Sequence, residues 1–126
     1  MSEFAYQYVV IRCVPRVERQ EFLNVGVALY CQSAEFLGFA WHCDEPRVAA
    51  FAPEIDPQSI CDGLSFLERV CAGDASVGTA GEQPMGTRFG FVKAPRSTIL
   101  QPSPVHGGLT SDPAAELNRL MDLLVR

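Results

Sequence analysis

Tyr6-Gln-Tyr-Val-Val-Ile-Arg-Cys-Val14 decides the fold class, because a run so rich in aromatic and β-branched side chains is typical of a β-strand. Pro15 ends the run, since proline has no N–H group to donate to a neighbouring strand. Two further strands are predicted at Val25–Cys31 and at Phe36–Trp41. The link between them, residues 32–34, has the length of a hairpin connection, so we expect these two strands to pair antiparallel.

Three helices are predicted from capping residues and apolar spacing. A short helix spans residues 44–52, and a longer one begins at Asp56-Pro57 and ends at Gly73. The last helix begins at Asp112-Pro113 and carries one apolar stripe. The members of that stripe are Leu117, Leu120, Met121 and Leu124.

The remaining segments complete the predicted architecture. Residues 74–85 lack periodicity and are expected to form a surface loop. Residues 87–92, with alternating phenylalanines, predict a fourth strand, and residues 97–101 a fifth. The order of these elements favours an α+β fold over residues 1–126. We expect a single domain with a largely antiparallel sheet of about five strands and helices packed on one face.

Composition and charge narrow the function classes. The chain has 126 residues, is 48% hydrophobic and 20% charged, and carries a net charge of −5, which is typical of one globular domain. An acidic balance argues against nucleic acid and membrane surfaces as partners. The N-terminus lacks signal-peptide features, and the longest apolar stretch is too short to span a bilayer. Five cysteines without close pairs indicate buried free thiols and a cytoplasmic location.

The distribution of charge is more informative than its total. Residues 32–74 contain eight acidic and two basic side chains, whereas residues 84–111 contain no acidic side chain at all. The acid-free segment carries Arg88, Lys93 and Arg96. Because guanidinium groups and hydroxyls together bind phosphate or carboxylate well, this segment predicts an anion site.

The candidate ligand-binding residues are Arg12, Arg88, Arg96, Ser97, Thr98, Ser103 and His106. In this hypothesis the arginines clamp the anion, the hydroxyls donate hydrogen bonds, and His106 is a candidate catalytic acid or base. We expect Arg88, Arg96 and His106 to converge on one concave surface. Two structural alternatives stay open: Arg96 pairs with a carboxylate of the acidic region, and His106 belongs to an ordered connector over residues 101–110.

Familiar catalytic patterns are missing from the sequence. No G-x-S-x-G motif surrounds Ser103, so a serine hydrolase is disfavoured. The cysteines and histidines do not have the spacing of a zinc site, and no phosphate-binding P-loop is present. We therefore expect no metal and no cofactor, and whether the chain is an enzyme stays undecided.

Several motifs together carry a resemblance to a known family. They are Tyr8-Val-Val-Ile-Arg12, Glu21-Phe-Leu-Asn-Val-Gly-Val27, Arg88-Phe-Gly90, Ala94-Pro-Arg-Ser-Thr98, Gln101-Pro-Ser-Pro-Val-His106, Gly108-Leu-Thr110 and Asp112-Pro. With them the chain resembles a family of small bacterial proteins known as a domain of unknown function. The resemblance covers nearly the whole chain and is least characteristic over residues 42–84. Members are often encoded beside a protein that resembles HipA-type serine/threonine kinases, so the resemblance implies a kinase-like partner.

Two functional hypotheses follow. The favoured one is a non-catalytic partner or regulatory module of a kinase-like protein. The alternative is a small enzyme or binder of a phosphorylated or carboxylated ligand that uses the anion site. Phosphorylation of Ser97 or Thr98 by the partner would link the two hypotheses.

Overall fold

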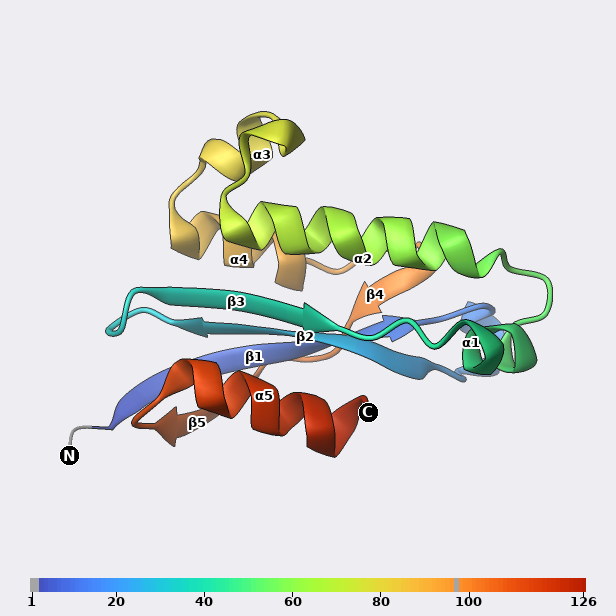
Figure 1. Cartoon of the computed structure of the whole chain (residues 1–126), viewed down its shortest axis with the longest axis horizontal. Helices are drawn as coiled ribbons and strands as arrows, with labels where there is room; N and C mark the ends of the chain where they lie inside the picture. The colour runs from blue at the N-terminus through green and yellow to red at the C-terminus, as the bar shows by residue number, and fades with distance from the viewer. Residues whose placement is uncertain (1–2, 97) are drawn as a thin grey trace.

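The computed structural model describes residues 3–96 and 98–126 and consists of one sheet with helices on both sides (Figure 1). The strands are β1 (Phe4–Cys13), β2 (Leu23–Cys31), β3 (Phe36–Trp41), β4 (Leu100–Pro102) and β5 (His106–Thr110). The helices are α1 (Glu45–Phe51), α2 (Pro57–Ala72), α3 (Thr79–Glu82), α4 (Met85–Lys93) and α5 (Pro113–Leu124), with 3-10 helices at Val17–Arg19 and Ala75–Val77.

Strand β1 is the centre of the sheet. Its neighbours on one side are β2 and then β3, and on the other side it pairs with β4 near its end and with β5 near its start. All these pairings are antiparallel. The α+β class, the three N-terminal strands, the hairpin between β2 and β3 and a sheet of five strands are therefore confirmed.

The placement of helices on a single face is wrong. Helices α2 and α4 lie on one side of the sheet and α5 lies on the other, as Figure 1 shows; we call these the α2/α4 side and the α5 side. The reason is visible in β1 and β2, where consecutive residues such as Val9, Val10 and Ile11 are all buried. Such continuous apolar runs are typical of strands that are covered on both faces.

The strand predicted at residues 87–92 is wrong, because α4 occupies that segment. Its two phenylalanines do not share a face: Phe89 is 1% exposed, whereas Phe91 is 41% exposed. Phe89 and Val92 are buried, and Met85 is half-buried four residues before Phe89, which is helical spacing. The aromatic residues of this segment favour a strand, but burial of Phe89 and Val92 on one face of a helix determines the observed structure.

Strand β5 was missed in residues interpreted as a connector. Glycine is depleted in strands, so the pair Gly107-Gly108 concealed it. Gly108 has a packing role, because a Cβ at this position would lie 2.6 Å from the hydroxyl oxygen of Tyr6. Strand β4 begins at Leu100, three residues later than the predicted fifth strand, whose first residue, Ser97, lies outside the described residues.

The predicted helix boundaries are confirmed. Asp44, Asp56 and Asp112 each accept a hydrogen bond from a backbone N–H in the first turn of α1, α2 and α5, respectively. Gly73 ends α2 with a φ of 72°, a left-handed conformation that glycine adopts without strain. Residues 74–85, expected to be a loop, contain short helical turns instead.

The cysteines correct another expectation. Cys43 and Cys61 form a disulfide with a Cα–Cα distance of 5.9 Å, which joins the segment before α1 to α2. Cys13, Cys31 and Cys71 are buried and free, as predicted. Burial raises the pKa of Cys71 to about 12. The disulfide is more typical of an oxidising compartment than of the cytoplasm, so the cytoplasmic location stays a prediction.

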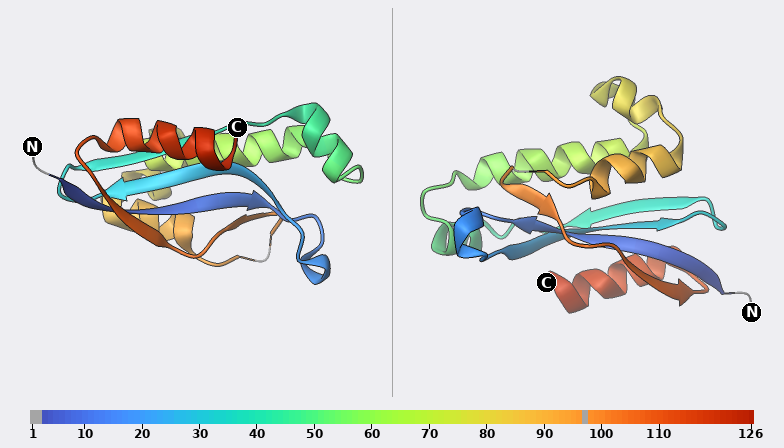
Figure 2. Two further views of the ribbon diagram at one scale, coloured as in Figure 1. Left: turned by 90° about the horizontal axis from the view of Figure 1, so that it is seen from below. Right: turned by 180° about the vertical axis from the view of Figure 1, so that it is seen from behind.

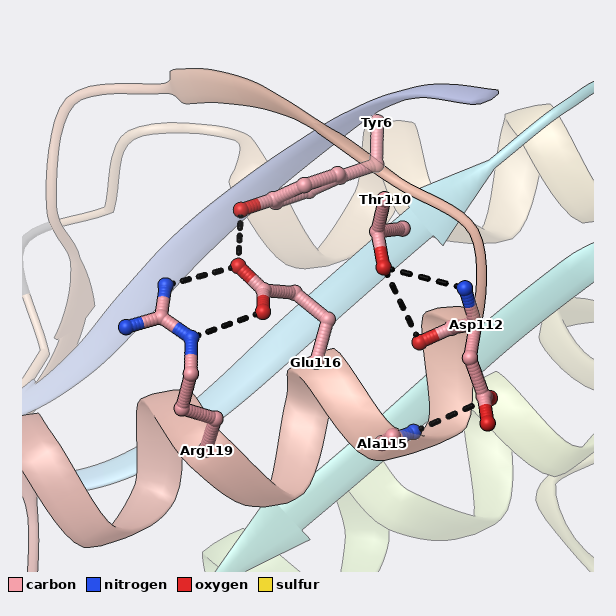
Figure 3. A network of polar contacts seen from close by, with 6 residues as sticks. All are labelled: Tyr6, Thr110, Asp112, Ala115, Glu116 and Arg119. Atoms are coloured by element: carbon pink, nitrogen blue, oxygen red, sulfur yellow. Dashed lines mark hydrogen bonds and ion pairs between the residues drawn. The ribbon is translucent and has the colours of Figure 1, made fainter. Parts of the chain in front are cut away.

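Helix α5 is anchored to the sheet by the network drawn in Figure 3. Tyr6 donates its hydroxyl hydrogen to Glu116, and Arg119 donates two hydrogen bonds of 2.8 Å to the same carboxylate. These donors hold the pKa of Glu116 below its usual value, Arg119 contributing most. Thr110, at the end of β5, accepts a hydrogen bond of 3.0 Å from the backbone N–H of Asp112. The network therefore fixes α5 against both β1 and the turn that precedes it.

Two findings bear on the excluded function classes. Among the helices that the structure describes, none has the length and apolar character required to cross a bilayer. Within residues 3–96 and 98–126, no group of three or more metal-ligating side chains is brought together.

Candidate functional site

A β-bulge in β2 orients the residues of the candidate site. Ile11 lies opposite Gly26 and Arg12 lies opposite Asn24, so Val25 is the extra residue. The bulge lets Val25 enter the core on the α2/α4 side while Asn24 lies on the α5 side. A Cβ at Gly26 would lie 3.1 Å from the carbonyl oxygen of Ala40, a tight contact that glycine avoids.

Arg12 is the middle member of a polar row across three strands. Its cross-strand neighbours are Asn24 on β2 and Gln101 on β4. Directly opposed residues in an antiparallel pair point to the same face, so all three share the α5 side. Each comes from a different motif of the family resemblance. We call Asn24, Arg12 and Gln101 the polar row.

The guanidinium group of Arg12 lies on an aromatic ring. Its Cζ atom is 4.0 Å from the ring centroid of Phe22, which is 45% exposed. This contact holds the side chain by a cation–π interaction. Within residues 3–96 and 98–126 Arg12 donates no side-chain hydrogen bond, and its Nε is enclosed without a partner. A cation positioned in this way keeps its hydrogen-bonding capacity for an external carboxylate or phosphate.

The polar row lies beside the C-terminal end of α5. Asn24 donates from Nδ2 to the carbonyl oxygen of Leu124 at 3.1 Å, and Arg47 donates to that of Val125 at 3.3 Å. Both bonds satisfy carbonyl groups that a helix end leaves without intrahelical partners. Asn24 Oδ1 is enclosed and has no partner among the described residues. The Asn24 side of the row is therefore held in place by its hydrogen bond to the end of α5.

His106 lies further along the same face. It is opposite Tyr8, and the two ring centroids are 5.3 Å apart. His106 is exposed and makes no side-chain hydrogen bond within the part of the chain that the structure describes. The histidine belongs to β5 rather than to a connector, so that alternative is wrong. Among the described residues no hydrogen bond joins its ring to a nucleophile or carboxylate, and its catalytic role stays a prediction.

Ser103 is buried, and its polar groups form hydrogen bonds within the sheet instead of facing solvent. Its backbone N–H donates to Val10 O at 2.7 Å, and its hydroxyl accepts from Val10 N–H at 2.8 Å. The hydroxyl then donates to Pro104 O at 2.8 Å. Buried Ser103 thus bridges β4 and β5 along β1, which leaves little capacity for a ligand.

Arg88 also has structural partners. It donates to the carbonyl oxygens of Gln83 at 2.9 Å, of Val70 at 3.4 Å and of Cys71. Val70 and Cys71 belong to the last turn of α2, where the carbonyl of Val70 also accepts a hydrogen bond of 3.1 Å from the backbone N–H of Gly73. Arg88 therefore joins the end of α2 to α4 and the turn before it.

Arg96 contacts an aromatic residue of α4. Its Cζ lies 5.0 Å from the ring centroid of Phe91, and it donates a hydrogen bond to the carbonyl oxygen of that residue. Burial lowers the pKa of Arg96. Among the described residues it forms no ion pair, so the predicted link to the acidic region is not formed there.

The expected convergence of three site residues is not observed. Arg88 contacts the end of α2 and Arg96 contacts Phe91 of α4, whereas His106 lies on the α5 side. The hydroxyl of Thr98 donates to Leu100 O at 2.8 Å within a turn, and Ser97 lies outside the described residues. The linear charge pattern thus does not translate into one site, because the acid-free segment passes from one face of the sheet to the other.

A separate hollow of about 390 Å³ lies beside the connection between β1 and β2. Its lining residues are Pro15, Arg16, Arg19, Glu21, Phe51 and Glu54. Arg19 is paired with Glu21, so half of its cationic lining is already neutralised. The charges are mixed and exposed, and they do not single out one ligand class.

Comparison with known proteins adds one finding. The family model described as "Protein of unknown function (DUF3037)" matches residues 8–125, from β1 to the end of α5. The chain belongs to this family. The DUF3037 match includes every member of the polar row, and it confirms the family resemblance at the level of a domain of unknown function. The kinase-like neighbour stays a prediction. No curated protein and no solved structure matches the chain.

Proposed function

We propose that this DUF3037 protein is a non-catalytic module that docks on a kinase-like partner through Arg12 and Phe22. The observation that carries the proposal is the guanidinium group of Arg12, held on an exposed ring without a hydrogen-bond partner among the described residues. Clusters of arginine and aromatic side chains are the residues that most often dominate protein–protein interfaces. The kinase-like character of the partner comes from the family resemblance.

The surroundings of the other candidate residues support a non-catalytic role. Ser103 uses its hydroxyl for bonds within the sheet, and the three free cysteines are buried. His106 packs against Tyr8 with the two rings tilted by 31°, and no hydrogen bond to a nucleophile is formed within the described residues. A catalytic group must lie within hydrogen-bond reach of the proton it moves, and none of these residues forms such a pair.

The chemistry of Arg12 defines the contact on the partner. Of its three nitrogens, Nε is the one enclosed without a partner, so the terminal nitrogens can receive a carboxylate or phosphate group. The ring of Phe22 supplies apolar area next to that charge. We therefore expect an acidic or phosphorylated side chain of the partner, flanked by an apolar one.

Co-purification tests this proposal directly. The tagged chain is co-expressed with the kinase-like protein encoded beside its gene, and the complex is compared for wild type, Arg12→Ala, Arg12→Lys and Arg16→Ala. Arg16 is an exposed arginine on the same connection and serves as the matched control. We expect Arg12→Ala to lose the complex, Arg12→Lys to keep part of it and Arg16→Ala to keep all of it. Full retention by Arg12→Ala, or no complex with wild type, overturns the proposal.

A second candidate function is binding of a small phosphorylated or carboxylated ligand. It is favoured by Arg96, which belongs to an acid-free segment and makes a cation–π contact with the ring of Phe91. Among the residues that the structure describes, Arg96 forms no ion pair. A ligand that binds the folded state raises its stability, by roughly 2.7 kcal/mol at 100 times its Kd. Thermal melts with phosphate, sulfate and dicarboxylates test this candidate. A rise in wild type that Arg96→Ala abolishes supports it, and an unchanged melt across the panel contradicts it.

A further inference from the structure

Strand β5 is an unprotected edge of the sheet. Figure 2 shows it along the outer margin, and within the described residues its recorded strand partner is β1. Natural proteins usually protect edge strands with charged side chains, proline, bulges or a covering helix. The sequence His106-Gly-Gly-Leu-Thr110 contains no Asp, Glu, Lys, Arg or Pro, and its pairing with β1 is regular.

The face of the sheet beside β5 is also open on the α2/α4 side, whereas on the α5 side Tyr6 lies against Gly108 and is bonded to Glu116 of α5. Helix α5 packs on β2 and β3, and α2 packs on β3, so these helices cover the other half of the sheet. As a result Leu109 is 65% exposed on the α2/α4 side, and its neighbours Ala5 and Gln7 on β1 are exposed as well. An added strand would therefore find these apolar and polar side chains uncovered on the α2/α4 side.

We propose that two copies of the chain associate through β5, paired antiparallel about a two-fold axis at Gly108. In this register Gly107 lies opposite Leu109 of the second copy, and His106 lies opposite Thr110 of the second copy. Each exposed Leu109 side chain then covers the position at which Gly107 has no side chain. Opposed residues share a face, so both Leu109 side chains become buried on the α2/α4 side.

The pattern of β5 favours a second copy as the occupant, because the exposed Leu109 fits the open position at Gly107 of an identical strand. The chain carries a net charge of −5, but no acidic residue belongs to β5, so two like-charged copies can meet there without direct repulsion. Shifting the register by one residue would place Leu109 opposite Gly108, away from the open position at Gly107. Five residues a copy make an interface smaller than the standard size, so the dimer is expected to form in a concentration-dependent way.

Sedimentation velocity over protein concentrations up to about 1 mM measures this association. The test variant is Leu109→Lys, and the control is Leu123→Lys on α5, because Leu123 is equally exposed, at 66%. We expect Leu109→Lys to weaken dimerisation at least tenfold and Leu123→Lys to leave it unchanged. A wild-type protein that stays monomeric throughout, or equal effects of the two variants, overturns the proposal.

Cysteine crosslinking tests the register. A side chain at Gly107 is accommodated, since its Cβ would lie at an ordinary 3.4 Å from the nearest atom, a backbone oxygen of Tyr6. Under mild oxidation, a mixture of Gly107→Cys and Leu109→Cys proteins should form disulfide-linked dimers, whereas each variant alone should form few. Preferential crosslinking of either variant with itself contradicts the register.

The same variants separate this inference from the proposed function. Leu109→Lys is expected to keep the kinase-like partner, and Arg12→Ala is expected to keep self-association. If wild type does not self-associate while Leu109→Lys loses the partner, the edge receives a strand of that partner and the second-copy proposal fails.

Discussion

Replacing Arg88 tests whether it is a structural residue rather than an anion ligand. Its guanidinium group donates to three carbonyl oxygens, two of them in the last turn of α2. A hydrogen bond that involves a charged group contributes about 1.5–3 kcal/mol, and a cation at a helix C-terminus adds about 0.3–1 kcal/mol. Since Arg88 is partly exposed, we expect Arg88→Ala to lower the free energy of unfolding by about 2–4 kcal/mol.

Thermal and urea denaturation measure that loss without any ligand present. For a chain of this size a loss of 1 kcal/mol lowers Tm by about 4 °C, so Arg88→Ala should melt roughly 8–16 °C below wild type. Arg88→Lys should recover a minor part, because an ammonium group cannot reach three carbonyls in the geometry of a guanidinium fork. Arg16→Ala, which removes an exposed arginine, should change stability by less than about 0.5 kcal/mol. A melt of Arg88→Ala within that same margin of wild type would refute the structural role.

Three further predictions concern the α5 anchor and the disulfide. Tyr6→Phe should cost about 1.5 kcal/mol in urea denaturation, since Glu116 loses the Tyr6 hydroxyl as a donor; no loss would mean that the contact is not stabilising. The pKa of Glu116 is lowered in the folded state, so its stabilising contribution is present above the usual glutamate pKa and is lost as pH falls through the lowered value. Melts between about pH 5 and pH 2 should therefore fall more steeply for wild type than for Glu116→Gln, and parallel curves would count against the ion pair. Cys61→Ser should lower stability by about 3 kcal/mol, because the bond to Cys43 closes a chain separation of 18 residues, and a reductant should destabilise wild type but not the variant.

Local signals in the sequence predicted much of the fold correctly. The caps at Asp44, Asp56 and Asp112 and the stop at Gly73 depend on neighbouring residues alone, and each appears in the structure. The segment of α4 failed because its alternating aromatic residues satisfy a strand pattern, whereas the burial of Phe89 is decided by packing on the sheet. The continuous apolar runs of β1 and β2 are typical of strands covered on both faces, so the sequence carries the information that helices lie on both sides.

The candidate site was predictable in part. Arg12 belongs to the predicted set of ligand-binding residues, and within the described residues its side chain forms no hydrogen bond. The polar row could not be derived, because the alignment of Arg12 with Asn24 depends on the register shift that Val25 causes. Arg88 was assigned to the ligand from charge alone, yet a basic residue near a helix end often serves the exposed carbonyl groups of that helix.

Calorimetric titration of the purified kinase-like protein into this chain tests the proposed docking most directly. Wild type and Arg16→Ala should bind with the same affinity, whereas Arg12→Ala should bind at least tenfold more weakly, a loss of about 1.4 kcal/mol. Thermal melts of each variant show that it is folded at the temperature of the titration, so a loss of affinity is not a loss of folding. Equal affinity of wild type and Arg12→Ala, or the absence of binding by wild type, would contradict the assignment of Arg12 as the centre of the interface.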